Sequence, residues 1–332
     1  MGPVGTSNLA TLLGSQSRGA AIRTELDRAQ IELSTGRVTS LIEATKGDLQ
    51  PLYGIESRLS TVQADLDAVT IGQTRLDSAE AALDQIATLT DSFGPEFANA
   101  VSGLIPGENE AVSRRAGDIL EDVIGVLNIA PGGRALFGGA SVDGPVLDSS
   151  TDLLDALRTA LTGSTDIAAD IEAFFFDTAG PFETTIWNGA DPALPARTSL
   201  GGDVHAPPVA NAPALKDVLT GLSAAFLSSD PAFAADAAVT AELQAVAETA
   251  LLNSRGSLTG LRERLGIDQA QLALLDERLT AESNALTTSR NEIIAADPYE
   301  TATWLNALEA QLDAFYTVTA RQSALSFTRY LG

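Results

Sequence analysis

The stretch from Ser257 to Leu286 reads SLTGLRERLGIDQAQLALLDERLTAESNAL, and its leucines recur at steps of three, four and seven residues. The members of this stripe are Leu258, Leu261, Leu265, Leu272, Leu275, Leu279 and Leu286. Steps of three and four place side chains on one face of a helix, and sustained spacing of this kind is typical of a coiled-coil seam. At 1.5 Å rise per residue the helix is about 50 Å long, so its seam needs a long partner.

A second stripe nearer the start of the chain has matching spacing. Its members are Leu59, Val62, Leu66, Val69, Gln73, Leu76, Glu80 and Leu83. Because two narrow apolar stripes can bury each other in an antiparallel bundle, we expect the two stretches to pair. The sequence therefore predicts a mainly α fold. It would be a long antiparallel helical bundle or coiled coil of N- and C-terminal segments, with a small mixed or β-rich central insert.

The two ends of the chain carry another pair of helical stripes. One runs from Leu9 to about Leu33 and stops at Ser34-Thr35-Gly36, where the glycine suits a helix end. The other follows Pro298 and comprises Leu305, Leu308, Leu312, Phe315, Val318 and Leu325. We expect residues 1–42 with 296–332 to form a terminal helical assembly domain.

The remaining helical segments, residues 43–140 with 214–295, are expected to form a rod domain. Within the rod a third helix is predicted from about Glu110 to Asn128. A loop is predicted from Phe93 to Gly107, because Gly94-Pro95 and Pro106-Gly107 are typical of turns.

Residues 141–213 form the predicted central insert. They contain half of the chain's 14 prolines and an aromatic run, Phe174 to Phe176. A strand is predicted at Glu183–Trp187, before the turn signal Asn188-Gly189. A short helix is predicted from Leu153 to Leu161, so the insert is read as mixed or mostly β.

Composition limits the classes of function. A formal net charge of -24 argues against a nucleic-acid partner, because phosphate binding needs clustered Lys and Arg. There is no Cys and only one His, His205, so we expect no metal site. The glycine pairs 132–133 and 138–139 lack the lysine of a phosphate-binding loop, and we expect no cofactor and no catalytic residue. No membrane insertion and no cleavable signal peptide are expected either.

Four short motifs follow one another along the chain. They are ELSTGR at 32–37, LDSAEAALDQI at 76–86, GGRALFGG at 132–139 and ARQSALSFTRYL at 320–331. Together they resemble the bacterial flagellin family, which includes the flagellar hook-associated proteins. The counterparts there are an "LSTG" element, a second helix ending "ALxxI", a "GGRYLFGG" segment and, in hook–filament junction proteins (hook-associated protein type 3), a terminal "ARISQLSLLNYL". The resemblance covers about residues 1–140 and 210–332.

Two members of this family remain as alternatives. Filament flagellins usually carry "SAKDDAAG" after the first helix, and SLIEATKGDL at 40–49 departs from it. The stretch VANAPALKDVL at 209–219 is more similar to junction proteins, although FTR at 327–329 replaces their "LLN". We therefore favour a junction protein over a filament flagellin.

The resemblance implies a structural, non-enzymatic role in the extracellular flagellum after passage through the flagellar export apparatus. The terminal helices would pack against neighbouring subunits in a ring or helical assembly, and the insert would face outward. The implied partners are other copies of the chain, a neighbouring hook-associated protein and flagellin, with an export chaperone as a further candidate. The predicted assembly interface comprises Leu26, Leu33, Leu305, Leu308, Leu312, Phe315, Leu325, Tyr330 and Leu331.

Two further classes of function stay open from the residues alone. One is a surface-binding or adhesive module that acts through the insert at 141–213. The other is an enzyme with paired carboxylates, for which the sequence contains no motif.

Overall fold

The structure is a computed structural model, and it describes residues 5–103, 108–141 and 143–331. Side chains are described within 13–103, 109–141 and 143–321. The chain divides into two compact units. Met1–Val62 with Ala281–Gly332 is called the terminal unit here, and Gln63–Thr280 the body unit.

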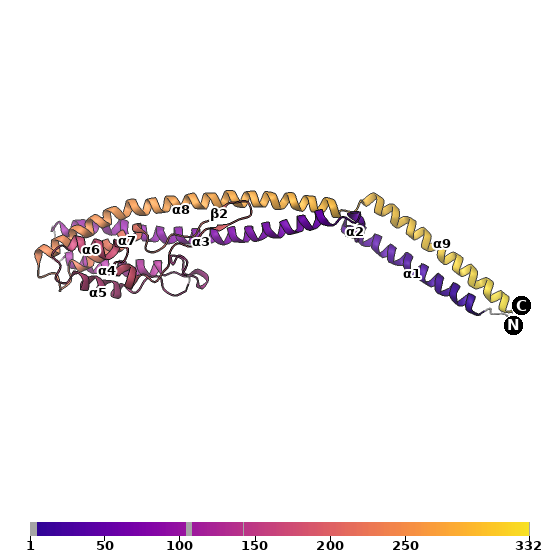
Figure 1. Ribbon diagram of the computed structural model, residues 1–332, viewed down its shortest axis with the longest axis horizontal. Coiled ribbons are helices and arrows are strands. Elements are labelled where there is room, and N and C mark those ends of the chain that lie inside the picture. Colours follow the sequence, from indigo (N-terminus) through magenta and orange to yellow (C-terminus); the bar gives the residue numbers. More distant parts are fainter. Residues whose placement is uncertain (1–4, 104–107, 142, 332) are drawn as a thin grey trace. The chain divides into compact units, whose positions relative to one another are not determined.

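Long helices make up most of both units (Figure 1). The terminal unit holds α1 (Gly5–Thr35), α2 (Leu41–Ala44) and α9 (Pro298–Leu331), together with the start of α3 (Gln50–Val101) and the end of α8 (Ala237–Ile294). As predicted, α1 ends before Gly36, whose φ of 66° is a left-handed conformation that glycine adopts without strain. Pro298 begins α9, where its missing N–H costs nothing.

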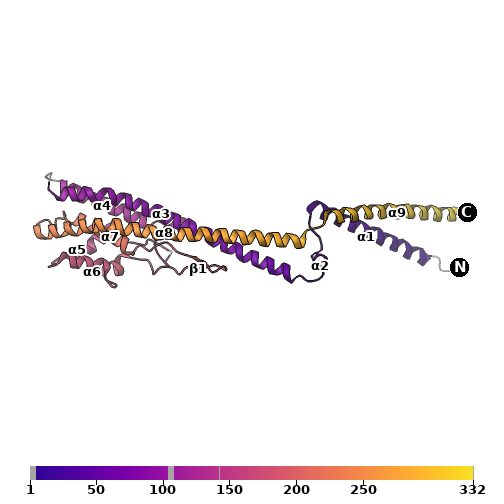
Figure 2. The same ribbon diagram turned by 90° about the horizontal axis from the view of Figure 1, so that it is seen from above.

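The body unit adds shorter elements to the later part of α3 and the earlier part of α8 (Figure 2). They are α4 (Glu108–Leu127), η1 (Pro131–Gly133), α5 (Ser150–Leu161), α6 (Ile167–Phe176), η2 (Phe182–Ile186), β1 (Ala196–Arg197), β2 (Asp203–Val204) and α7 (Pro213–Leu227). The two strands pair antiparallel, with Ala196 opposite Val204. The predicted mainly α fold and the predicted helices at Glu110–Asn128 and Leu153–Leu161 are confirmed.

In the body unit the two long stripes lie buried along α3 and α8, as predicted. The fully or nearly fully buried members are Val69, Leu76, Leu83, Leu258, Leu265, Leu272 and Leu279. Polar pairs flank them in antiparallel order: Asp91 with Arg255, Glu80 with Arg262 and Asp77 with Gln269. Burial of the leucines supplies most of the stabilisation, since each contributes about 1.5–3 kcal/mol relative to exposure.

The loop predicted from Phe93 to Gly107 is wrong for its first half, because α3 continues through Pro95 to Val101. Phe93 and Phe97 are buried on the inner face of this extension, and their ring centroids lie 5.8 Å apart. Proline has no N–H to bond the carbonyl four residues earlier, which here belongs to Asp91. Arg255 Nη2 donates to that carbonyl oxygen at 2.6 Å, so the α8 arginine satisfies the acceptor that Pro95 leaves free.

This compensation yields a prediction. Arg255→Met should destabilise the wild-type chain by about 1 kcal/mol more than it destabilises a Pro95→Ala chain. In the alanine background the restored N–H can bond the Asp91 carbonyl, so losing Arg255 no longer leaves that acceptor without a partner in the protein. Urea unfolding of the four chains of this double-mutant cycle would give the coupling. A coupling of zero would show that Arg255 does not compensate for the proline.

The insert is mixed rather than β-rich, and the strand predicted at Glu183–Trp187 is wrong. Residues Phe182–Ile186 instead form a single π-helical turn. Phe182 and Ile186 are both buried at a four-residue spacing, and the Phe182 ring centroid lies 5.5 Å from that of Phe175. A strand would have placed these two side chains on one face as well, but helical backbone also brings Glu183 to the Nζ of Lys216 on α7. That nearly buried ion pair is compatible with the helical turn and would be costly to break.

Among the residues the structure describes, no helix combines the length and apolarity of a membrane span.

Candidate assembly surface on the terminal helices

Helices α1 and α9 pack side by side and antiparallel in the terminal unit (Figures 1 and 2). The ring of Phe315 lies over Gly19, where a β-carbon would approach its Cε1 to 2.9 Å. Arg23 Nη2 donates to the Tyr316 hydroxyl at 2.6 Å, and the Arg28 guanidinium lies 5.7 Å from the centre of the Trp304 ring. Small-against-large packing and two arginine–aromatic contacts therefore fix the register of the pair.

The predicted interface residues fall into four groups. Leu308 is 7% exposed, and so it is largely used inside the chain. Half-buried positions on α1 and α9 are Leu26, Leu305, Leu312 and Phe315. Leu33 is 40% exposed. Leu325, Tyr330 and Leu331 lie outside the residues whose side chains are described.

Other large apolar side chains of this helix pair face solvent. Ile31 is 52% exposed and Val318 is 54% exposed. The helical stripe of α1 did not identify Ile31, because that residue lies off the three-four spacing. Exposed β-branched residues on a helix contribute little to a monomer, and clusters of them mark contact surfaces. Ile31, Leu33 and Val318 are therefore available to a neighbouring subunit, as are the more exposed Leu13 and Tyr299 of the same pair.

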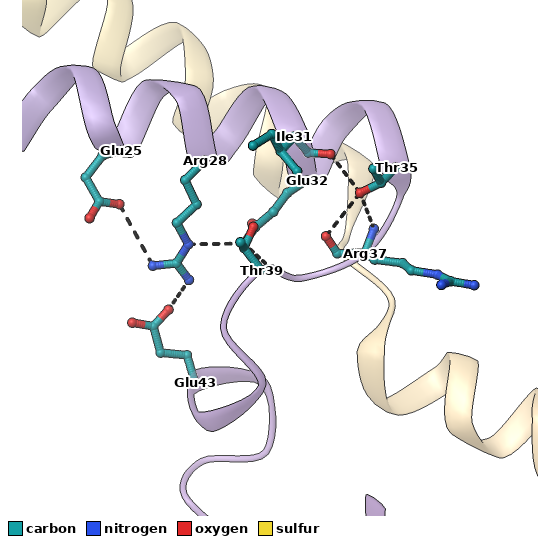
Figure 3. Close-up of polar contacts among 8 residues, drawn as sticks. All are labelled: Glu25, Arg28, Ile31, Glu32, Thr35, Arg37, Thr39 and Glu43. Atoms are coloured by element: carbon teal, nitrogen blue, oxygen red, sulfur yellow. Dashed lines mark hydrogen bonds and ion pairs between the residues drawn. The ribbon is translucent and has the colours of Figure 1, made fainter. Parts of the chain in front are cut away.

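A charged cluster lies at the end of α1 (Figure 3). The Arg28 guanidinium pairs with Glu32 at 3.2 Å, with Glu25 at 3.9 Å and with Glu43 of α2. Glu32 Oε1 also accepts the backbone N–H of Thr39 at 2.7 Å. One arginine thus holds α1, the connector after it and α2 together. The i,i+4 spacing of Arg28 and Glu32 predicts only the ion pair between those two residues.

These contacts set the protonation of the two carboxylates. Burial alone would raise the pKa of Glu32, but the bonds from Thr39 and Arg28 outweigh it and hold that pKa below its usual value. The Arg28 hydrogen bond likewise lowers the pKa of Glu43. Both groups are therefore charged at neutral pH, and the cluster is complete there.

The same connector is tied to the link between α8 and α9. Val38 N–H donates to the Ile294 carbonyl at 2.9 Å, and Ala296 N–H donates to the Gly36 carbonyl at 3.0 Å. These bonds flank an antiparallel bridge between Arg37 and Ala295. The segment that follows α1 and the segment that precedes α9 are thus joined by backbone hydrogen bonds. These bonds restrict how far the two helices can separate at this end.

A pH-dependent prediction follows from Glu32. Because its folded-state pKa lies below the unfolded value of about 4.5, its stabilising contribution is full above that value and is lost as pH falls through the folded-state pKa. At neutral pH, Glu32→Gln should therefore speed hydrogen exchange of the Thr39 amide relative to the wild type. The ratio of the two rates should shrink towards one as the pH falls through the lowered folded-state pKa of Glu32.

The matched control is Glu309→Gln, which alters an exposed side chain of α9. It should leave Thr39 exchange unchanged at every pH. A Glu32→Gln effect that persisted undiminished in acid would show that the side chain acts through its shape and not its charge.

Comparisons with known proteins find likenesses among solved structures. No protein-family model and no curated protein matches the chain. Among solved structures, a crystal structure of FlgL from Bacillus cereus is similar with a TM-score of 0.38 and 13% sequence identity. The likeness covers 74% of this chain and 100% of that one.

Proposed function

We propose that this chain is a structural subunit of the bacterial flagellum that joins hook to filament through its terminal helices. The observation that carries the proposal is the order of four flagellin-family motifs, with the first and last on α1 and α9. The proposal is a mechanical one: the protein transmits force through packed helices and performs no chemical reaction. Its partners would be other copies of itself, a neighbouring hook-associated protein and flagellin, outside the cell.

The terminal unit supports this role physically. A pair of helices can bury only the faces that its members turn towards each other, and the outer faces remain available. On the outer faces of α1 and α9, Ile31, Leu33 and Val318 present apolar side chains to solvent. Packing these against like surfaces of neighbouring subunits would remove them from water, which favours association by about 25 cal/mol per Å² of apolar surface.

The Arg28 cluster and the backbone bridge at Arg37 hold in place the segments that connect to α1 and α9. A subunit that passes force between two assemblies needs such a restraint, because a loose hinge beside the interface would absorb motion without transmitting it. Neither feature is needed to bury the body unit's core, which lies along α3, α8 and the short helices.

Quantifying the protein in purified flagella tests the proposal and distinguishes a junction protein from the alternative, a filament flagellin. A junction protein should be present at a low, fixed ratio to the hook subunit, and a filament flagellin should be the dominant protein. Mass spectrometry with isotope-labelled peptides on hook-attached and sheared filaments distinguishes the two. Absence of the chain from both preparations would contradict a flagellar role and would favour the surface-binding reading of the insert.

A further inference from the structure

A pocket in the body unit lies between α3 and two loop segments that the proposed assembly role does not use. Its volume is about 680 Å³, and its walls come from residues 70–78, 131–140, 193 and 206. A volume of this size is typical of small-molecule sites in proteins. Two arginines, Arg75 and Arg134, lie in the wall.

No carboxylate neutralises the two arginines of this wall. Arg158 and Arg262, by contrast, each pair with carboxylates within hydrogen-bonding distance. Among the ion pairs of the described residues, none involves Arg75 or Arg134. The residues that line the pocket include these two cationic side chains and no Asp or Glu.

The environment of Arg75 makes its charge costly. Its side chain is half-buried, and burial together with the like charge of Arg134 lowers its pKa. Arg75 Nη2 donates to the Ala135 carbonyl at 3.1 Å, which uses one of its five N–H donors. Arginine stays charged in proteins, so the partly desolvated Arg75, which lies beside the like charge of the exposed Arg134, is stabilised by an anion.

The rest of the wall is mainly apolar. Ile71 is exposed on α3, and Leu136 is buried beneath the pocket, with Ala193 and Ala206 beside them. A bare inorganic ion would leave this surface in water, whereas a ligand with an apolar portion would cover it. The pocket thus combines a cationic side with a hydrophobic side.

We infer that this pocket binds a small organic anion, with its carboxylate or phosphate group at Arg75 and Arg134 and its apolar part against Ile71 and Leu136. Guanidinium groups hold both kinds of headgroup through paired charge-assisted hydrogen bonds. The inference does not depend on the proposed flagellar role, because it uses only residues of the body unit.

Titration calorimetry of the full chain tests the inference with four probes. Hexanoate and hexyl phosphate carry both halves of the ligand, while inorganic phosphate carries only the charge and 1-hexanol only the apolar part. We expect one or both of the first two to bind with a Kd in about the millimolar range or tighter, and about tenfold more tightly than either partial probe. Their relative affinity identifies the headgroup.

Variants then assign the binding to this pocket. Arg134 is exposed, so Arg134→Gln should preserve the fold and weaken the better probe by about tenfold or more. Arg75→Gln should have a similar or larger effect. Arg278→Gln, which removes an exposed charge elsewhere in the body unit, should leave the affinity unchanged.

Failure of both hexyl probes to bind would overturn the inference. So would equal binding to the wild type and Arg134→Gln, or inorganic phosphate binding as tightly as hexyl phosphate. An equal loss in Arg278→Gln would show a general charge effect and would overturn it too.

Discussion

Replacing Leu272 by aspartate is expected to lower the free energy of unfolding by about 3–5 kcal/mol. The Leu272 side chain is 0% exposed in the seam between α3 and α8. Its Cδ1 lies 3.3 Å from the place where a β-carbon on Gly72 would stand, so the two helices approach closely there. A carboxylate at this point has neither water nor a cation, and the substitution also leaves a void.

Leu274→Asp is the matched control, because it makes the same change two residues away on the same helix. Leu274 is 54% exposed, so its substitution should cost less than about 1 kcal/mol. Urea unfolding monitored by circular dichroism would compare the two. Equal losses in both variants would contradict the seam register, because a seam distinguishes the inner from the outer face.

The second large effect is expected on assembly. On the proposed function, Leu33→Asp should abolish or strongly reduce filament attachment while leaving the unfolding free energy of the purified chain within about 1 kcal/mol. Leu33 is already partly in water in the isolated chain, but in an assembly its partner surface would have to bury an unpaired carboxylate. The cost recurs at each copy of a ring or helix, so a modest penalty per subunit becomes decisive.

Thr24→Asp is the control, since it adds the same charge to an exposed polar position on the opposite face of the same helix. Electron microscopy should show hooks without filaments for Leu33→Asp, and normal filaments for Thr24→Asp. Normal filaments in both strains would place Leu33 outside any subunit contact. A large loss of stability in purified Leu33→Asp would instead assign the residue to the chain's own core.

The seam between α3 and α8 was predictable because it depends on the spacing of apolar residues that are near one another in the sequence. Val69, Leu76 and Leu83 recur every seven residues, and the helix turns this recurrence into one buried face. The helix end at Gly36 was predictable for the same reason, since its signal lies within three residues.

Features that depend on distant partners were missed. Gly94-Pro95 is a turn signal by itself, and the donor that bonds the Asp91 carbonyl in the proline's place comes from Arg255, which is far away in the sequence. The fold around Glu183 likewise depends on Lys216. No local pattern reports such pairings, because the tertiary contact overrides the local preference.

In the candidate assembly surface, too, the features set by local spacing were predicted and those set by distant contacts were not. Leucine spacing identified the faces of α1 and α9, but not which residues the pair would bury, so Leu308 is largely internal and Ile31 is exposed. The joint role of Arg28 and Glu43 arises from the connector's path, which spacing does not specify. The pocket at Arg75 and Arg134 joins residues from separate segments and left no sequence signal.

The proposal that the chain joins hook to filament is tested most directly by electron microscopy of cells that lack it. On the proposed function, deleting the gene from the organism that encodes this chain should leave hooks at normal number but without filaments, with flagellin released into the medium. Expression of the wild-type chain from a plasmid should restore the filaments. Filaments of normal length attached to the hooks of the deletion strain would contradict the account.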